Sequence, residues 1–445
     1  MESILIKTAQ LLLSLSILVV LHEAGHFMFA RLFNTRVEKF YLFFDPWFSL
    51  FKTKKGDTEY GIGWLPLGGY VKISGMIDES MDKEAMKLPP QPYEFRAKPA
   101  WQRLLIMVGG VLMNFIFAMV IYIGVLYAWG EQYLPTANVK YGIVVNEQGE
   151  EIGFKTGDKI LTVDNIYVEE FHKVVPTIVL DGAKTVQVER NGQKIDVEIS
   201  GEDLALLLKS KSIWDERIPY DINIGKLAKD YPAAKAGLQV GDILGTVDGN
   251  AFEYYDEFTK YLESKAGSDI EIAFTRDGNK MTKTITVNEE GKLGFNPAFN
   301  NSDLFEFKTI KYGFLESIPA GIKRGVQTTS NYLKQFKLIF NKETKGYESL
   351  GGFATIGNIF SPTWDWGHFW NMTAFISIIL AIMNLLPIPA LDGGHVMFLF
   401  GEIITGRKPG EKFLEYAQIA GMILLLGLVL YANANDIIKM INGTF

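Results

Sequence analysis

The segment Thr8–Ala30, which reads TAQLLLSLSILVVLHEAGHFMFA, decides the fold of this chain. At about 1.5 Å per helical residue it is long enough to cross a bilayer. It is apolar until Leu21–His26, where a glutamate stands between two histidines. Ionisable groups at membrane depth are costly and usually mark function. The segment therefore predicts a spanning helix that carries a functional polar site.

The spacing of these polar residues has a chemical meaning. His22 and His26 lie four residues apart, so both imidazoles project from one helix face and can bind one zinc ion. Glu23 is rotated away from them and can act as general base on a metal-bound water. There are two alternatives to a zinc site: a helix whose polar side chains are satisfied by hydrogen bonds within a cluster, and a secretory signal peptide. A signal has an uncharged core and a small-residue cleavage site, which Glu23 and Arg31 contradict, so a zinc site is favoured.

Hydropathy along the chain predicts further spanning helices. Leu104–Trp129, Phe369–Leu391 and Tyr416–Asn435 form three more long apolar runs, none of which contains a charged residue. A long, mostly polar insertion separates the second run from the third. At 445 residues the chain is too long for one ordinary domain. We expect four spanning helices and a large aqueous insertion.

Charge and cysteine content narrow the possible partners. A net charge of −7 argues against a nucleic-acid partner. The chain contains no cysteine, which excludes disulfides and thiolate zinc sites. The partners that remain are the lipid bilayer itself and proteins.

The positions of the basic residues predict the orientation of the spans. Lys and Arg cluster after the first run, before the second, and between the third and fourth (Arg31, Arg36, Lys39; Arg96, Lys98, Arg103; Arg407, Lys408, Lys412). Loops rich in positive charge stay in the cytoplasm. The insertion and both termini should then face the outside.

The insertion contains an internal repeat. Gly153–Asp164 (GFKTGDKILTVD) recurs as Gly237–Asp248 (GLQVGDILGTVD), and each copy is followed by a turn signal between alternating segments. Two copies of a small α+β module are predicted. The pattern resembles PDZ domains, which bind extended peptides by adding a strand to a sheet edge. The alternative is that the copies are spacers that bind no peptide.

A catalytic zinc usually has three protein ligands, so a third is expected in the membrane region. Asp392 is the favoured candidate, because Asn384–Gly394 (NLLPIPALDGG) contains prolines that no regular helix interior accommodates. Irregular backbone at membrane depth is tolerated where it lines a cavity. His22 and Asp392 both fall toward the cytoplasmic ends of their spans. The remaining histidines, His172, His368 and His395, are the other candidates.

The two motifs together resemble the site-2 protease family of intramembrane zinc proteases, and the paired modules resemble its bacterial members that regulate sigma-E. The resemblance covers nearly the whole chain. It implies that His22, His26 and Asp392 bind Zn²⁺, that Glu23 is catalytic, and that Asn384 contacts substrate. It also implies a multi-pass protein of the bacterial inner membrane, with extracytoplasmic PDZ domains and an active site toward the cytoplasm.

Gly61–Lys72 (GIGWLPLGGYVK) resembles the family's membrane-associated β-hairpin. An exposed strand edge there can pair with an unwound substrate helix, and Gly68, Gly69 and Tyr70 are the expected substrate contacts. A purely structural hairpin is the alternative. One departure from the family is Gly351-Gly352-Phe353, where relatives often have Gly-Gly-Pro.

The predicted fold class is an α-helical integral membrane protein with four spanning helices, a membrane-associated β-hairpin and two inserted α+β PDZ-like domains. Lys311–Phe340 is predicted to be an amphipathic helix, either on the outer membrane face or packed on the second module. The predicted segments are 1–35 (first span), 36–103 (cytoplasmic loop with hairpin), 104–130 (second span), 131–212 and 213–300 (PDZ-like modules), 301–365 (amphipathic helix and linker), 366–395 (third span) and 410–436 (fourth span).

The expected function is cleavage of single-span membrane proteins, such as an anti-sigma factor already trimmed outside the cell. The alternative is a non-catalytic scaffold whose PDZ modules bind peptides. Inactive relatives of proteases typically lose the base or a ligand, and this chain retains all of them. A metal transporter would have more polar residues across its spans than Asn114 and Gln418.

Overall fold

The computed structural model describes residues 2–76, 89–210, 212–220, 222–298, 304–339 and 346–442. Phe340, the last residue of the predicted amphipathic helix, lies outside these ranges, as do parts of the predicted segments 36–103, 213–300 and 301–365. The chain forms two compact units. One, the membrane unit, comprises Met1–Gly130, Lys311–Phe336 and Leu350–Phe445. The other, the insertion unit, comprises Glu131–Ile310 and Lys337–Ser349.

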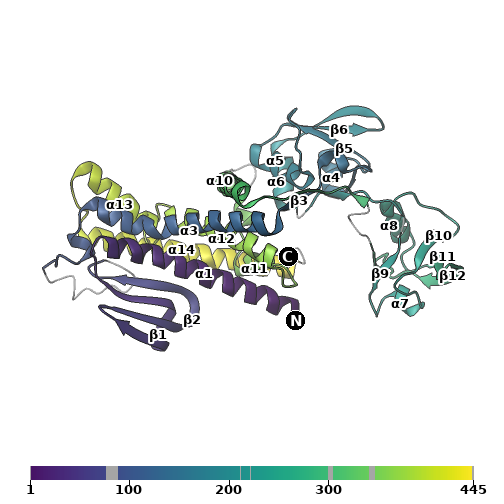
Figure 1. Ribbon diagram of the computed structural model, residues 1–445. Coiled ribbons are helices and arrows are strands. Elements are labelled where there is room, and N and C mark those ends of the chain that lie inside the picture. Colours follow the sequence, from purple (N-terminus) through teal and green to yellow (C-terminus); the bar gives the residue numbers. More distant parts are fainter. Residues whose placement is uncertain are drawn as a thin grey trace. The chain divides into compact units, whose positions relative to one another are not determined.

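Among the described residues, four helices are long and apolar enough to cross a membrane, as predicted. They are α1 (Glu2–Leu32), α3 (Ala100–Trp129), α12 (Trp366–Leu385) and α14 (Glu411–Ile441). Helix α3 contacts both α1 and α12, and the three run side by side in Figure 1. These three helices carry most of the polar residues of the site.

Close approach of α1 to α3 depends on glycine. A Cβ atom on Gly25 would lie 2.2 Å from the carbonyl oxygen of Gly109, and one on Gly109 would lie 2.7 Å from that of Gly25. Both distances are far below van der Waals contact. The crossing lies within the H-E-x-x-H motif, so its histidines face α3 directly.

The third apolar run is not one helix. Helix α12 ends at Leu385, an irregular segment follows, and a new helix, α13 (Asp392–Thr405), begins at the aspartate. Pro387 and Pro389 account for the break, because they lack the N–H that a helix interior needs. The hydropathy pattern predicted one continuous span over residues 366–395 and not the separate helix α13, which packs on α3 with an ion pair between Arg103 and Glu402.

The predicted hairpin is a sheet that folds on itself. Strands β1 (Val37–Lys55) and β2 (Thr58–Ile73) are antiparallel, and Leu42 pairs with both Ile62 and Gly69. The early part of β1 is therefore central, between the two halves of β2. Residues 69–73 pair on one side only, within the part of the chain that the structure describes. They form an edge of the sheet.

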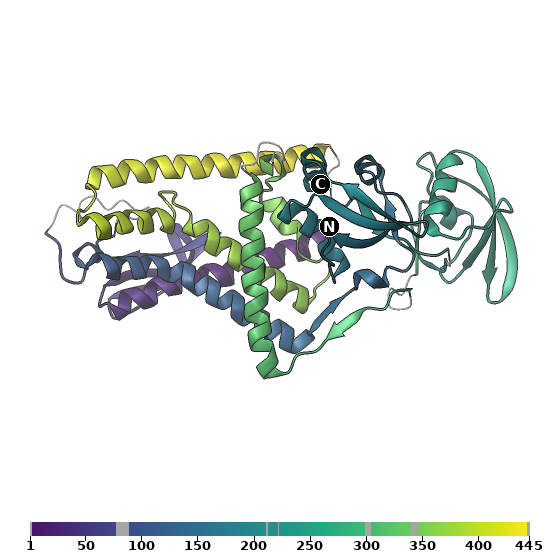
Figure 2. The same ribbon diagram turned by 90° about the horizontal axis from the view of Figure 1, so that it is seen from above.

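Three more helical segments of the membrane unit lie among the described residues. Helix α10 (Phe314–Ile339) is helical as predicted and runs across the direction of α3 and α14 in Figure 2. Its Gly321 packs on α3, where a Cβ atom would lie 2.6 Å from Ile123. Helix α11 (Phe353–Asn358) is attached to α14, because the backbone N–H of Thr355 donates to Asp436 over 3.0 Å. A 3-10 turn, η1 (Phe95–Ala97), precedes α3.

The insertion unit contains two modules of similar design, each with a three-stranded antiparallel sheet and its own buried core. The first consists of β4 (Ile143–Val145), α4 (Glu147–Ile152), β5 (Lys159–Val163), α5 (Val174–Asp181), β6 (Thr185–Arg190), β7 (Gln193–Glu198), α6 (Gly201–Lys209) and β8 (Trp214–Glu216). The second consists of β9 (Ile224–Leu227), α7 (Pro232–Lys235), β10 (Ile243–Val247), α8 (Tyr255–Ser264), β11 (Asp269–Arg276), β12 (Asn279–Thr286) and β13 (Phe295–Pro297).

Equivalent strands pair in the same way in the two modules: β4 with β8, and β9 with β13. Strands β3 (Glu131–Tyr133) and β14 (Lys308–Ile310) pair at the two ends of the insertion. Short 3-10 turns occur at η2 (Thr136–Asn138), η3 (Phe171–Lys173) and η4 (Gly346–Ser349). The chain therefore enters and leaves the segment Glu131–Ile310 along one small ladder.

The repeated motif encodes the same buried ion pair twice. Arg190 donates to Asp158 through Nε and a terminal nitrogen, both at 2.7 Å, and Arg276 donates to Asp242 with the same two distances. Both aspartate side chains have no exposed surface. A buried carboxylate needs such a partner, since desolvation of an unpaired charge is costly. The repeated aspartates are therefore structural.

We expect Arg276→Leu to destabilise the second module, because it leaves the Asp242 carboxylate, which has no exposed surface, without its partner. Hydrogen exchange of the full-length protein should show faster exchange in β10–β12 and unchanged exchange in the first module. Lys292→Ala is the control, because the Lys292–Glu290 pair is exposed and should contribute little. Unchanged protection in Arg276→Leu would contradict this account.

The same pair predicts a pH dependence. Burial raises the pKa of Asp242, but the hydrogen bonds from Arg276 and the Gln239 N–H outweigh burial and hold it below the usual 3.8. A carboxyl whose pKa is lowered by folding stabilises the folded state above its unfolded pKa. That contribution is lost as the pH falls through the lowered value. The second module should therefore lose protection in acid, and Arg276→Leu should reduce this dependence.

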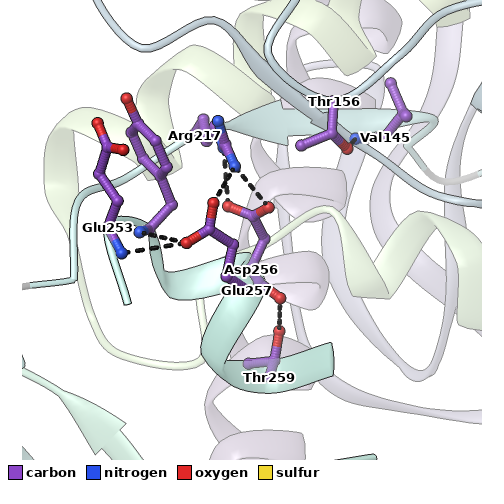
Figure 3. A network of polar contacts seen from close by, with 8 residues as sticks. Val145, Thr156, Arg217, Glu253, Asp256, Glu257 and Thr259 are labelled. Carbon is purple, nitrogen blue, oxygen red and sulfur yellow. Dashed lines mark hydrogen bonds and ion pairs between the residues drawn. The ribbon is translucent and has the colours of Figure 1, made fainter. Parts of the chain in front are cut away.

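Arg217 joins the two modules. It follows β8 of the first module and reaches the first turn of α8 in the second, as Figure 3 shows. Its Nε donates to Asp256 over 2.9 Å and a terminal nitrogen donates to Glu257 over 3.2 Å. The guanidinium lies 3.5 Å from the centre of the Tyr254 ring. Glu257 also accepts from the backbone N–H of Glu253, so the contact includes the capping of α8.

Candidate metal centre

Three predicted ligands meet in the membrane unit. His22 and His26 lie one turn apart on α1, and Asp392 is the first residue of α13. The two histidine Nε2 atoms are 3.2 Å apart, and Asp392 Oδ2 lies 3.0 Å from that of His22 and 3.3 Å from that of His26. The side chains are 11, 7 and 16% exposed. Residues from opposite ends of the chain thus form one compact cluster.

These distances suit a tetrahedral zinc ion. Ligand atoms about 2.0–2.1 Å from zinc lie roughly 3.3–3.4 Å apart along the edges of a tetrahedron. Two imidazole nitrogens and one carboxylate oxygen are also a common donor set for catalytic zinc, which keeps a fourth position open. The cluster therefore fits zinc in donor chemistry and in spacing.

The protonation of His26 supports the same conclusion. Its Nδ1 lies 2.8 Å from the carbonyl oxygen of Ile106 on α3, which can only accept a hydrogen bond. Nδ1 therefore carries the proton, and in the neutral ring Nε2 presents a lone pair to the cluster. That lone pair is available to a metal ion bound between His26 and Asp392.

Gly110 makes room for the two imidazoles. A Cβ atom at this position on α3 would lie 2.5 Å from His26 Nε2 and 2.8 Å from His22 Nε2. Contacts this short do not occur in folded proteins, so a side chain at position 110 would force the imidazoles to shift. The sequence analysis missed Gly110, although a Gly-Gly pair in an uncharged spanning helix was a visible signal of close packing.

Glu23 lies beside the ligands and lines a cavity of about 670 Å³. The backbone N–H of Val71, on the edge of the sheet, is directed at its carboxylate. All three ligands line the same cavity, together with sheet-edge residues 69–73 and Gln418. The predicted general base, the three predicted ligands and a strand edge therefore share one space.

The structure brings most of the other predicted residues to this place. Gly69 and Tyr70 line the cavity, whereas Gly68 precedes them and packs near Phe44. Asn384, near the end of α12, has its Nδ2 3.4 Å from His22 Nε2. The predicted substrate contacts thus lie near the metal cluster, with Gly68 one residue beyond the lining.

The alternative histidine ligands do not join the cluster. His172 lies in the insertion unit, 3.5 Å from Glu170, and His368 contacts the carbonyl oxygen of Ile359 over 2.8 Å. His395 lines the cavity, but among the described residues the group close enough to share a metal is His22, His26 and Asp392.

Tyr70 belongs to a polar network in the cavity wall. Its hydroxyl donates to Asp45 Oδ1 over 2.8 Å and accepts from Lys39 over 3.4 Å. Burial and the neighbouring Asp45 raise the pKa of Tyr70, so the phenol stays protonated at physiological pH. It therefore acts as a hydrogen-bond donor.

Comparison with known proteins agrees with this geometry. The sequence profile of Peptidase family M50 matches residues 10–428, which include both motifs. The chain belongs to Peptidase family M50. This is the site-2 protease family that the motifs resemble, and its members are proteases.

Similar proteins span the whole length of this M50 peptidase. The regulator of sigma E protease of Haemophilus influenzae is 29% identical over 98% of this chain and 100% of its own. The regulator of sigma-E protease RseP of Escherichia coli is 28% identical over 99% of this chain and 100% of its own. A Clostridium perfringens protein that carries the name zinc metalloprotease is 27% identical over 96% of this chain and 97% of its own.

One similar solved structure is the PDZ domain of the SdrC-like protein of Listeria innocua. It is 23% identical and covers 18% of this M50 peptidase and 96% of its own chain, with a TM-score of 0.17. A corresponding domain from Listeria monocytogenes is 26% identical, covers 20% of this chain and 94% of its own, and has the same TM-score.

Proposed function

We propose that this M50 peptidase is a zinc-dependent intramembrane endopeptidase that cleaves single-span membrane proteins. The observation that carries the proposal is the convergence of His22, His26 and Asp392 beside Glu23, with both histidines and Glu23 on a helix long enough to span a bilayer. The related proteins named regulators of sigma-E protease make an anti-sigma factor a reasonable class of substrate.

The proposed chemistry assigns one role to each residue. His22, His26 and Asp392 would hold zinc, which when bound acidifies water and polarises a carbonyl oxygen. Glu23 accepts the proton of the attacking water and delivers it to the leaving amine. The Asn384 amide, which lies beside the ligands, donates to the substrate backbone near the scissile bond.

The sheet edge supplies a way to present the substrate. A helical peptide bond is shielded by its own hydrogen bonds, so it must unwind before it can be cut. Gly69–Ile73 has no strand partner on its outer side among the described residues, and it lines the cavity. An unwound substrate segment can add to this edge as a strand, which places its backbone beside Glu23.

The proposed orientation follows from the charges that flank the spans. Basic residues follow α1, precede α3 and lie between α13 and α14. The ligands lie near these ends, since His22 and His26 are in the last third of α1 and Asp392 follows α12. The site would thus face the cytoplasm and the insertion unit the outside of a bacterial inner membrane.

We also propose that the second module binds the peptide ligand. A cavity of about 600 Å³ lies between α8 and the β9–β13 ladder and is bordered by Gly291–Gly294. In the first module the corresponding loop, between β7 and β8, contains helix α6 instead. Helix α6 contacts α5, the counterpart of α8, and buries Leu204 and Leu207 in the core. The first module is therefore the weaker candidate for peptide binding.

The decisive experiment combines the purified protein with a single-span substrate whose outer domain has been trimmed. We expect cleavage within the spanning segment, inhibition by a zinc chelator, and recovery on addition of zinc. Binding without cleavage, with zinc present, would favour the scaffold alternative. An untrimmed substrate should be cut more slowly. If deletion of residues 135–290 leaves that difference unchanged, the insertion does not filter substrates by size.

A further inference from the structure

Asn114 lies at the back of the metal cluster and has no role in the chemistry proposed above. It is a residue of α3, one turn after Gly110, and it is completely buried. Its Nδ2 is 3.3 Å from Nδ1 of His22, the ring nitrogen that faces away from the cluster. Its Oδ1 is also buried and has no hydrogen-bond partner among the described residues. An orphaned amide oxygen at this depth requires an explanation.

The two ends of an amide are exchanged by a half-turn of the side chain, and the hydrogen-bond network decides between them. If Asn114 Nδ2 faces His22, the ring nitrogen Nδ1 of His22 must accept the hydrogen bond. A neutral His22 ring then carries its proton on Nε2. That proton would occupy the position where His22 is to bind a metal. If Asn114 Oδ1 faces His22 instead, the His22 Nδ1 carries the proton, and its Nε2 is free to bind a metal.

Rotation of the amide gives Oδ1 a donor and moves Nδ2 to the position that has no partner among the described residues, so the protonation of His22 decides between the two orientations. The rotated amide gives His22 the same protonation as His26, whose Nδ1 donates to the Ile106 carbonyl. Both histidines then donate from Nδ1 to oxygen atoms of the same helix, α3, and both present Nε2 to the cluster. Metal-binding histidines usually have this arrangement, in which an outer acceptor selects the protonated nitrogen.

We propose that Asn114 is a positioning residue for the metal site: its Oδ1 accepts the Nδ1 proton of His22 and directs the Nε2 lone pair at the metal. The proposal rests on the proposed zinc site. Asn114 is not among the described residues that line the cavity, so it acts through His22 and not on substrate. It is held from the other side as well, because Ser377 on α12 donates to its backbone oxygen over 2.8 Å.

The test is the zinc affinity of the full-length protein in detergent, measured by competition with a chelator. Asn114→Leu keeps the size of the side chain and removes the acceptor, and we expect about 10–100-fold weaker zinc binding. Asn114→Asp keeps an acceptor and adds a charge, so it should bind zinc at least as tightly as the wild type. Ser377→Ala is the matched control, because it loses a contact to Asn114 but none to the imidazole.

A second readout separates positioning from a general structural effect. In Asn114→Leu, excess zinc should restore much of the cleavage rate, whereas a distorted fold would not recover. The absorption of the cobalt-substituted protein should change in Asn114→Leu and stay the same in Ser377→Ala. If Asn114→Leu does not fold, Asn114→Asp decides, since zinc binding ten times weaker than that of the wild type would overturn the proposal.

The outcomes distinguish this proposal from the one on which it rests. If the wild type binds no zinc, the proposed zinc site itself fails. If the wild type and Asn114→Leu bind zinc equally well, the site stands and only the role of Asn114 is overturned.

Discussion

Glu23→Gln should lower the rate of substrate cleavage by about 10²–10⁴-fold, the typical contribution of a positioned general base. Glutamine has nearly the same shape as glutamate but cannot accept a proton from water at neutral pH. Glu23 is not one of the three clustered ligands, so zinc binding should be retained. The measurement is the single-turnover rate on a trimmed single-span substrate, with the zinc content of the same preparation.

Glu38→Gln is the matched control for this substitution. Its carboxylate lies on the sheet, 3.4 Å from Lys72, and is not among the described residues that line the cavity. We expect wild-type cleavage from it. Full activity in Glu23→Gln would show that another group activates the water, and loss of zinc would show that Glu23 supports the ligands instead.

Asp392→Ala should abolish zinc retention and cleavage together. Its Oδ2 lies within 3.3 Å of both histidine Nε2 atoms, and it is the only carboxylate in the described metal cluster. Its removal leaves two neutral ligands. The loss of zinc affinity should therefore exceed the roughly 10–100-fold loss that follows removal of a residue that only hydrogen-bonds a ligand. Chelator competition and elemental analysis measure the effect directly.

Asp365→Asn provides the comparison for Asp392→Ala. Asp365 caps the start of α12, where its carboxylate accepts from the N–H of His368, and asparagine caps a helix equally well. This variant should keep both zinc and activity. Tight zinc binding in Asp392→Ala would exclude Asp392 as a ligand and return His395, which also lines the cavity, to consideration.

Features that depend on near neighbours in the chain were predictable from the sequence. The four long apolar helices follow from hydropathy alone. The juxtaposition of His22 and His26 follows from the helical period, and the break after Leu385 follows from two prolines. The repeated Gly-Asp segments predicted two similar modules, but not that Arg190 and Arg276 pair with the buried aspartates.

Other features depended on how the helices pack. The contact between α1 and α3 brings Gly110 and Asn114 to the histidines, and the start of α13 brings Asp392 to them. Gly110 and Asn114 were not predicted as site residues, because an isolated glycine or amide in a spanning helix has no local pattern that shows what it faces. The open edge at Gly69–Ile73 could not be predicted either, because it exists only where β1 pairs with both halves of β2 and leaves these residues with a strand on one side.

The sequence by itself determined the four long apolar helices, the break after Leu385, and that one turn of α1 offers two imidazoles and a carboxylate. Only the tertiary structure decided that the third donor lies within 3.3 Å of both, and that α3 provides the space and the outer hydrogen bonds. The physical reason is one of range. Helical period, proline and hydropathy act over a few residues, whereas a metal site needs donor atoms from distant segments placed to within tenths of an ångström by close packing.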